Sequence, residues 1–126
     1  MTLIFGDFKL ASGIKSWYKL ECDLLTDSDI EIILENNKHR IPEFGIAMGV
    51  PTGGLRIARL IEKYKTPDSS KILIVDDVLT TGSSVKTFII DNDLKVNNVF
   101  VLFSRIKSED IRIPFVSCFS FIEGSV

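Results

Sequence analysis

The chain has 126 residues, a hydrophobic fraction of 45%, a charged fraction of 25% and a formal net charge of −2. This length suits one domain with a real core, and the composition excludes a disordered chain and a general nucleic-acid binder. Residues 1–10 carry Asp7 and no long apolar run, so we expect neither a signal peptide nor a membrane anchor, and we expect a cytoplasmic protein.

Neither the cysteines nor the single histidine forms a metal-binding pattern. Cys22 and Cys118 lie far apart in the sequence, with no CxxC motif and no neighbouring histidine. We interpret them as free buried thiols in preference to a disulfide or a metal site. His39 has no second ligand at metal-binding spacing, and we interpret it as an exposed linker residue in preference to a catalyst.

Short strands and a helix are predicted in the first third of the chain. Residues 1–26 alternate loosely between apolar and polar positions and are interrupted by glycines, which predicts an edge hairpin or a small hood. Asp27 or Ser28 is expected to cap the helix that follows. The apolar residues of this helix recur at helical spacing: Ile30, Ile33 and Leu34.

A strand, a glycine-rich turn and a second helix are predicted next. The apolar run 44–50 predicts a buried strand. The turn Val50-Pro51-Thr52-Gly53-Gly54 leads into a helix with the apolar residues Leu55, Ile57, Ala58, Leu60 and Ile61. Such a turn can bind an anion, because the first N–H groups of a helix lack partners inside it. Glycine-rich turns of this kind are common, so the pattern alone also fits a purely structural turn.

The strongest functional signal lies in residues 71–84, KILIVDDVLTTGSS. A six-residue connector, 65–70, joins this stretch to the preceding helix and has a normal length for an α/β unit. The apolar run 72–75 predicts a strand buried on both faces, and Asp76 and Asp77 are expected where it leaves the core. A hydroxyl-rich turn then precedes a helix with the apolar residues Val85, Phe88 and Ile89.

Two interpretations of this stretch are open from the residues alone. In the functional one, the hydroxyls, the glycine and the free N–H groups of the turn bind a phosphate. The two carboxylates then bind hydroxyl groups or a divalent cation of the same ligand, as a ribose 5-phosphate would allow. In the structural one, the two aspartates end the strand for solubility, and a Ser or Thr residue merely caps the helix.

The last elements complete an α/β domain. Residues 99–103 predict another buried strand, Arg105 follows it, and residues 115–122 alternate as an edge strand. The order of elements predicts an open, mostly parallel, doubly wound sheet with helices on both faces.

We expect one domain, 1–126, made of a hood segment, 1–26, and an α/β core, 27–126. In such sheets ligands lie beyond the carboxyl ends of the strands, at the topological switch point. The two anion-binding turns, 50–54 and 80–84, should therefore lie side by side.

Two motifs resemble those of a known family. The run ILIVDDVLTTGSS (72–84) resembles the phosphoribosyl pyrophosphate (PRPP) signature of the type I phosphoribosyltransferases. Near the N-terminus, Phe5-Gly6-Asp7-Phe8, Leu10, Ser12-Gly13 and Ser16 are similar to the opening segment of orotate phosphoribosyltransferases. The resemblance covers nearly the whole chain.

The resemblance implies transfer of the phosphoribosyl group of PRPP to a nitrogenous base, with an orotate-like pyrimidine favoured and pyrophosphate released. It implies that Asp76 and Asp77 hold the ribose hydroxyls and, through water and PRPP, the cofactor Mg²⁺. It implies a homodimer with no nucleic acid or membrane partner. The substrate-binding residues that it implies are Val78, Leu79, Thr80, Thr81, Gly82, Ser83, Ser84, Val50, Pro51, Thr52, Gly53, Gly54, Ser12, Gly13, Lys15 and Arg105.

The chain departs from this family in two places. Ala11 stands where the family usually has a ligand-binding lysine, and we expect Lys15 to reach the same anion instead. The long cationic lid that closes over pyrophosphate in orotate phosphoribosyltransferases is replaced by the connector 65–70. Three hypotheses follow: an enzyme that works without this lid, a weakly active or inactive PRPP- or nucleotide-binding regulatory protein, and a subunit whose partner supplies the lid.

Overall fold

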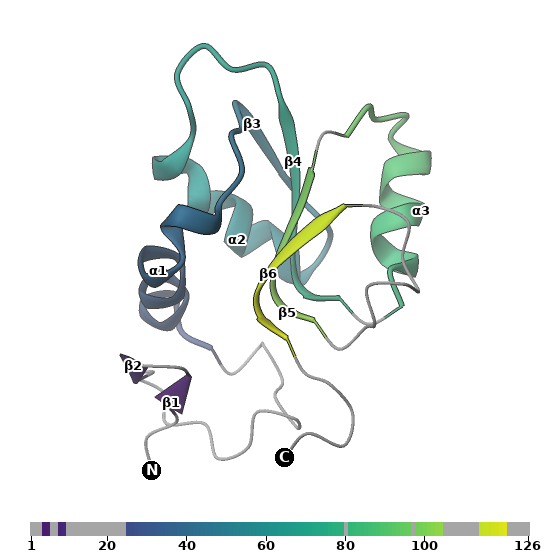
Figure 1. Cartoon of the computed structure of the whole chain (residues 1–126). Helices are drawn as coiled ribbons and strands as arrows, with labels where there is room; N and C mark the ends of the chain where they lie inside the picture. The colour runs from purple at the N-terminus through teal and green to yellow at the C-terminus, as the bar shows by residue number, and fades with distance from the viewer. Residues whose placement is uncertain are drawn as a thin grey trace.

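The computed structural model describes residues 4–5, 8–9, 25–79, 81–96, 98–104 and 114–120, with the backbone alone at 4–5, 8–9 and 120. Strands β1 (Ile4–Phe5) and β2 (Phe8–Lys9) pair antiparallel as a short hairpin, which fits the short strands predicted in the hood segment. The remaining described residues form an α/β unit around a single parallel sheet (Figure 1).

The parallel sheet contains four strands in the order β3-β4-β5-β6. Their bounds are β3 (Ile46–Gly49), β4 (Ile72–Leu79), β5 (Asn98–Ser104) and β6 (Phe115–Ser120). Every neighbouring pair is parallel, so each strand is reached by a crossover from the previous one. The predicted open parallel sheet is confirmed.

Helices cover both faces of the sheet, as a doubly wound fold requires (Figure 1). Helices α1 (Asp27–Asn36) and α2 (Gly53–Ile61) lie on one face, and α3 (Ser83–Asp91) lies on the other. Short 3-10 turns, η3 (Lys38–Arg40) and η4 (Glu62–Tyr64), follow the first two helices.

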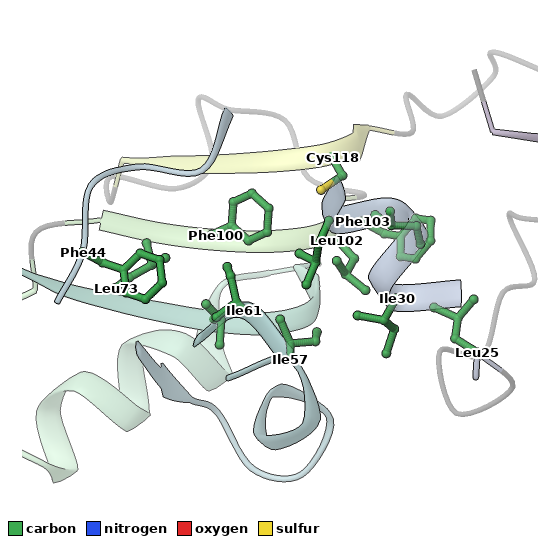
Figure 2. Close-up of a cluster of buried hydrophobic side chains, with 13 residues drawn as sticks. Leu25, Ile30, Phe44, Ile57, Ile61, Leu73, Phe100, Leu102, Phe103 and Cys118 are labelled. Carbon is green, nitrogen blue, oxygen red and sulfur yellow. The ribbon is translucent and has the colours of Figure 1, made fainter. Parts of the chain in front are cut away.

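The core consists of two apolar clusters, one on each face of the sheet. Side chains alternate along a strand, so Leu73 and Val75 pack toward α1 and α2 while Ile74 packs toward α3. Figure 2 shows the larger cluster, in which Leu73 lies beside Phe44, and α2 contributes Ile57 and Ile61. The predicted burial of this strand on both faces is therefore confirmed.

The cysteine and the histidine that the structure describes behave as expected. Cys118 is a free, buried thiol, and burial raises its pKa to about 12, so it stays protonated at neutral pH. His39 is exposed in η3. Cys22 lies outside the described residues.

The cap of α1 differs from the prediction. Its N-cap is Thr26, and neither Asp27 nor Ser28 has that role. The Thr26 Oγ1 accepts a hydrogen bond of 3.1 Å from the N–H of Asp29, and the Asp29 carboxylate accepts one of 2.9 Å from the N–H of Thr26. This reciprocal capping box satisfies two N–H groups at once, which favours Thr26 over its acidic neighbours.

The connector between α2 and β4 lies at the amino ends of the strands. Residues 65–71 run over this end in Figure 1, far from the turns that follow the carboxyl ends of β3 and β4. Thr66 N–H donates a hydrogen bond of 2.8 Å to the carbonyl of Phe44, just before β3. The connector, 65–71, is one residue longer than the predicted 65–70, and its position makes it unable to cover a site at the carboxyl ends of the strands.

Candidate functional site

Two turns follow the carboxyl ends of β3 and β4. The N–H of Val50 donates a hydrogen bond of 3.0 Å to the carbonyl of Val75, which ties the end of β3 to β4. Gly54 lies against the same carbonyl so closely that a Cβ there would overlap the oxygen. The peptide bond between Pro51 and Thr52 is cis. The turn 50–54 is thus held directly on the strand that carries the two aspartates.

Strand β4 continues past the aspartates, which corrects the sequence-based prediction. We expected Asp76 and Asp77 where the strand leaves the core, but β4 runs to Leu79. Asp76 pairs with Val101 of β5, and Val78 pairs with Phe103. Backbone pairing with β5 does not depend on side-chain polarity, so the acidic residues stay within the ladder.

The two carboxyl groups face different partners. Asp77 lies against Gly53 at the start of α2, and its Oδ1 accepts a hydrogen bond of 2.8 Å from the N–H of Val78. Asp76 lines a small pocket together with the turn 81–85. Successive residues of a strand point to opposite faces of the sheet, so Asp77 lies at the turn 50–54 and Asp76 lies at the turn before α3.

Asp76 is 7% exposed, and the described part of the chain places no cationic side chain in an ion pair with it. Burial raises the pKa of Asp76 to about 7, and the neighbouring Asp77 carboxyl group adds to the rise. A hydrogen bond of 2.8 Å from the N–H of Asp77 to Asp76 Oδ1 acts in the opposite direction. A ligand that donates hydroxyl groups or brings a cation would favour the ionised form.

The turn before α3 has the features of an anion site. Gly82 is the N-cap with a φ of 81°, in the left-handed region that favours glycine, and it has no side chain with which to cap the helix. Thr81 Oγ1 donates a hydrogen bond of 2.9 Å to Ser83 Oγ and accepts one of 3.2 Å from the N–H of Ser83. The interpretation of this turn as a simple Ser or Thr N-cap is therefore wrong.

The hydroxyl side chains of this turn remain accessible. Thr81, Ser83 and Ser84 are exposed, and they line the same pocket as Asp76. The first N–H groups of α3 have no partner inside the helix, and the helix dipole is positive at this end. The pocket thus combines one buried carboxyl group with a set of anion-binding groups.

The structure brings together the sequence-predicted site residues of both turns. Residues 50–54 and 76–79 lie at adjacent strand ends, and residues 81–84 follow on the other side of β4. The turn 50–54 and the described part of the second turn, 81–84, therefore flank β4, and the two carboxyl groups lie between them. The other predicted site residues lie outside the described residues: Ser12, Gly13, Lys15, Thr80 and Arg105.

Charged contacts that the sequence did not reveal join α2 to α1 and to Leu25, which precedes it. Arg56, in the first turns of α2, donates a hydrogen bond of 2.6 Å from Nη1 to the carbonyl of Leu25. Asp27 forms ion pairs with Arg59 at 2.8 Å and with Arg56 at 3.6 Å, and the Arg59 guanidinium lowers the pKa of Asp27. The sequence shows these arginines only as polar residues of a helix. In the structure, their contacts with Leu25 and Asp27 hold α2 against α1.

The described residues contain no group of three or more His, Cys, Asp or Glu side chains that could hold a metal ion alone. Asp76 and Asp77 are nevertheless oxygen donors of the kind that Mg²⁺ prefers, and Mg²⁺ commonly uses one or two carboxylates together with phosphate oxygens of a ligand. The pair therefore fits a cation that arrives with its ligand. Separately, no helix within the described ranges is long and apolar enough to cross a membrane.

The structure is similar to solved orotate phosphoribosyltransferases. The crystal structure of the enzyme from Aeropyrum pernix is 26% identical in sequence, with a TM-score of 0.58 over 91% of this chain and 86% of that chain. The Mycobacterium tuberculosis H37Rv enzyme in complex with 5-phospho-α-D-ribosyl 1-diphosphate (PRPP) is 18% identical, with a TM-score of 0.63 over 88% of this chain and 85% of that chain.

The same Mycobacterium tuberculosis enzyme in complex with inorganic phosphate is 15% identical, with a TM-score of 0.59 over 94% of this chain and 88% of that chain. No protein-family model and no curated protein matches the sequence. Similarity over this share of both chains agrees with the parallel sheet and with the fold that the signature at 72–84 implied. The chain therefore has the type I phosphoribosyltransferase fold.

Proposed function

We propose that this protein binds PRPP and transfers its phosphoribosyl group to a nitrogenous base, releasing pyrophosphate. One observation carries the proposal: the Asp76–Asp77 pair lies between two turns suited to anions, at the carboxyl ends of adjacent parallel strands. PRPP has a phosphate, a diol and a diphosphate in that order, and this order matches the order of the groups. Similarity to solved phosphoribosyltransferases supports the same reaction class.

Each part of the site has a separate role in this proposal. The turn 80–84 binds the 5-phosphate through its hydroxyls and the first N–H groups of α3. Asp76 and Asp77 accept hydrogen bonds from the ribose hydroxyls, which fixes the orientation of the sugar ring. The turn 50–54 and the N-terminus of α2 bind the diphosphate.

The reaction then depends mainly on positioning. The bond between the anomeric carbon and the diphosphate oxygen breaks, a nitrogen of the base bonds to that carbon from the opposite side, and the configuration inverts. The proton of that nitrogen passes to the departing diphosphate. The leaving diphosphate is already anionic, so the protein has little acid or base catalysis to perform. Bound Mg²⁺ would supply positive charge to the departing diphosphate, with Asp76 and Asp77 as the nearby protein oxygens.

An orotate-like pyrimidine is the base that we propose. The opening segment that resembles orotate phosphoribosyltransferases supports this choice, as does the similarity in structure to such enzymes. Arg105 is the proposed partner of the base carboxylate, because a planar guanidinium suits bidentate contact with a carboxylate. A cytoplasmic homodimer belongs to the same proposal.

A second function, binding of PRPP or a related nucleotide for regulation, is favoured by one specific observation. The connector 65–71 lies at the amino ends of the strands and therefore at the wrong edge of the sheet to close the site. A protein with an intact binding site and no lid of its own would bind the ligand but turn it over slowly, alone or until a partner chain supplied the missing cations.

Pyrophosphate release separates these functions. We would incubate the pure protein with Mg²⁺, PRPP and a panel of bases beginning with orotate, and use the Asp76→Asn/Asp77→Asn variant as the negative control. Release with one base supports the transferase and names its substrate. Binding of PRPP by calorimetry without release from any base supports the regulatory or partner-dependent function. Absence of PRPP binding refutes both.

A further inference from the structure

Gly53, the first residue of α2, lies directly against the carboxyl group of Asp77 in β4. A Cβ placed on Gly53 would first meet three atoms of one side chain, the Oδ2, Cγ and Oδ1 of Asp77. The Asp77 carboxyl group thus occupies the space that a larger residue at position 53 would need.

The neighbouring glycines have a different reason to be small. A Cβ on Gly54 would overlap the carbonyl oxygen of Val75, and one on Gly49 would overlap the backbone of Gly54. Those obstacles are backbone atoms, so Gly49 and Gly54 let α2 pack closely on the sheet. At Gly53 the obstacle is the end of a flexible side chain, which can rotate away.

We propose that Gly53 is a positioning residue for Asp77, because its missing side chain leaves the place from which the Asp77 carboxylate faces the ligand. The proposal rests on the proposed function, in which Asp77 accepts a hydrogen bond from a ribose hydroxyl. It couples two subsites sterically: the residue that begins α2 at the diphosphate turn also decides whether the sugar is recognised.

A methyl group at position 53 should leave the fold intact. Gly53 has no positive φ, so alanine fits its backbone, and alanine is the better residue in a helix. The methyl group would turn the Asp77 carboxyl group away and break its 2.8 Å hydrogen bond to the N–H of Val78. Recognition of the sugar should therefore weaken, at a small cost in stability from the lost hydrogen bond.

The first test compares the affinity for Mg²⁺ and PRPP with thermal stability in Gly53→Ala. We expect the Kd for PRPP to rise about 10-fold to 100-fold, as for loss of one hydrogen bond to a charged group, with at most a small fall in Tm. Leu55→Ala is the matched control, because Leu55 is 52% exposed in the same turn of α2 and should leave both quantities unchanged. An unchanged Kd, or a Kd that rises together with a large fall in Tm, would overturn the positioning role.

A double-mutant cycle separates an effect through Asp77 from direct obstruction of the diphosphate turn. In an Asp77→Ala background the methyl group has no carboxyl group to displace, so Gly53→Ala should not weaken PRPP binding further. A further loss of affinity in that background would mean that the methyl group blocks the turn itself, and the proposal would be wrong.

A crystal structure of Gly53→Ala distinguishes failure of this inference from failure of the proposed function. If the wild-type protein binds no PRPP, the proposed function fails, while the steric relationship is still decided by the position of Asp77. A displaced Asp77 carboxyl group with an unmoved turn 50–54 supports the inference. An unmoved Asp77 with a shifted turn overturns it.

Discussion

The N–H of Asp77 donates a hydrogen bond of 2.8 Å to Oδ1 of Asp76, the residue directly before it. This contact stabilises an ionised Asp76, yet burial outweighs it and raises the pKa of Asp76 to about 7. The carboxyl group is therefore partly protonated near neutral pH. Because the raised pKa means that the folded protein favours protonated Asp76, the free energy of unfolding falls as pH rises and this proton is lost.

Asp76→Asn should be more stable than the wild type at alkaline pH. Because the folded pKa exceeds the unfolded value of 3.8, the stabilising contribution of protonated Asp76 is complete below the unfolded pKa and is lost as pH rises through about 7. The folded and unfolded pKa values of Asp76 differ by about three units, which corresponds to at most about 4 kcal/mol of unfolding free energy. We expect Asp76→Asn to gain about 1–4 kcal/mol over the wild type at about pH 8.

Urea unfolding of both proteins between about pH 4 and pH 8 measures this difference, because titrating groups that do not interact with Asp76 cancel between them. The advantage of Asp76→Asn should grow with pH. A difference that stays constant across this range would contradict the raised pKa of Asp76.

Asp76→Asn/Asp77→Asn should lose PRPP binding and keep its fold. Two hydrogen bonds to charged acceptors are removed, which predicts a Kd at least about 100-fold higher. Calorimetry with Mg²⁺ measures this Kd, and circular dichroism checks the fold. Asp91→Asn, an exposed acidic residue at the end of α3, should bind PRPP like the wild type. Equal affinity in the double variant would remove the carboxylate pair from the site.

Gly82→Ala should destabilise the protein and weaken phosphate binding. A residue with a Cβ pays about 1–2 kcal/mol for the left-handed conformation that Gly82 adopts at a φ of 81°. Gly82→Asn should lose less, because asparagine tolerates this conformation better. Urea unfolding ranks the three proteins, and an alanine variant as stable as the wild type would show that the turn has another conformation.

Thr26→Ala should cost about 1 kcal/mol of unfolding free energy, because it removes the capping box of α1. Ser28→Ala is the matched comparison, since Ser28 is exposed one residue inside the helix and should change stability by less than about 0.5 kcal/mol. If Ser28→Ala lowered the unfolding free energy more than Thr26→Ala, the N-cap of α1 would be Ser28, one of the two residues predicted from the sequence.

The apolar runs of the sequence are sufficient to predict the sheet, because a strand buried on both faces has little room for polar residues. Residues 72–75 and 99–103 lie in β4 and β5 as expected. Strand ends are harder to predict, since backbone pairing with a neighbour decides them. The sequence predicted that the strand leaves the core at Asp76 and Asp77. The strand continues to Leu79, because β5 pairs with it as far as Ser104.

The candidate site could be predicted in composition but not in arrangement. The signature stretch contains the carboxylates and the hydroxyl turn, and their closeness follows from their order in the chain. The contact of Gly53 with Asp77 joins residues that are far apart in sequence, and it depends on how closely α2 approaches β4. The bond of Arg56 to the Leu25 carbonyl depends in the same way on the packing of α1 against α2.

The connector at the amino ends of the strands offers a place to lengthen the chain. Pro67 and Asp68 are both exposed, and Asp68 has a φ of 65°, typical of a turn. An insertion between them would project from the edge of the sheet opposite the two turns, where it meets neither ligand nor core. A fluorescent reporter or an affinity tag placed there would therefore leave the candidate site unobstructed.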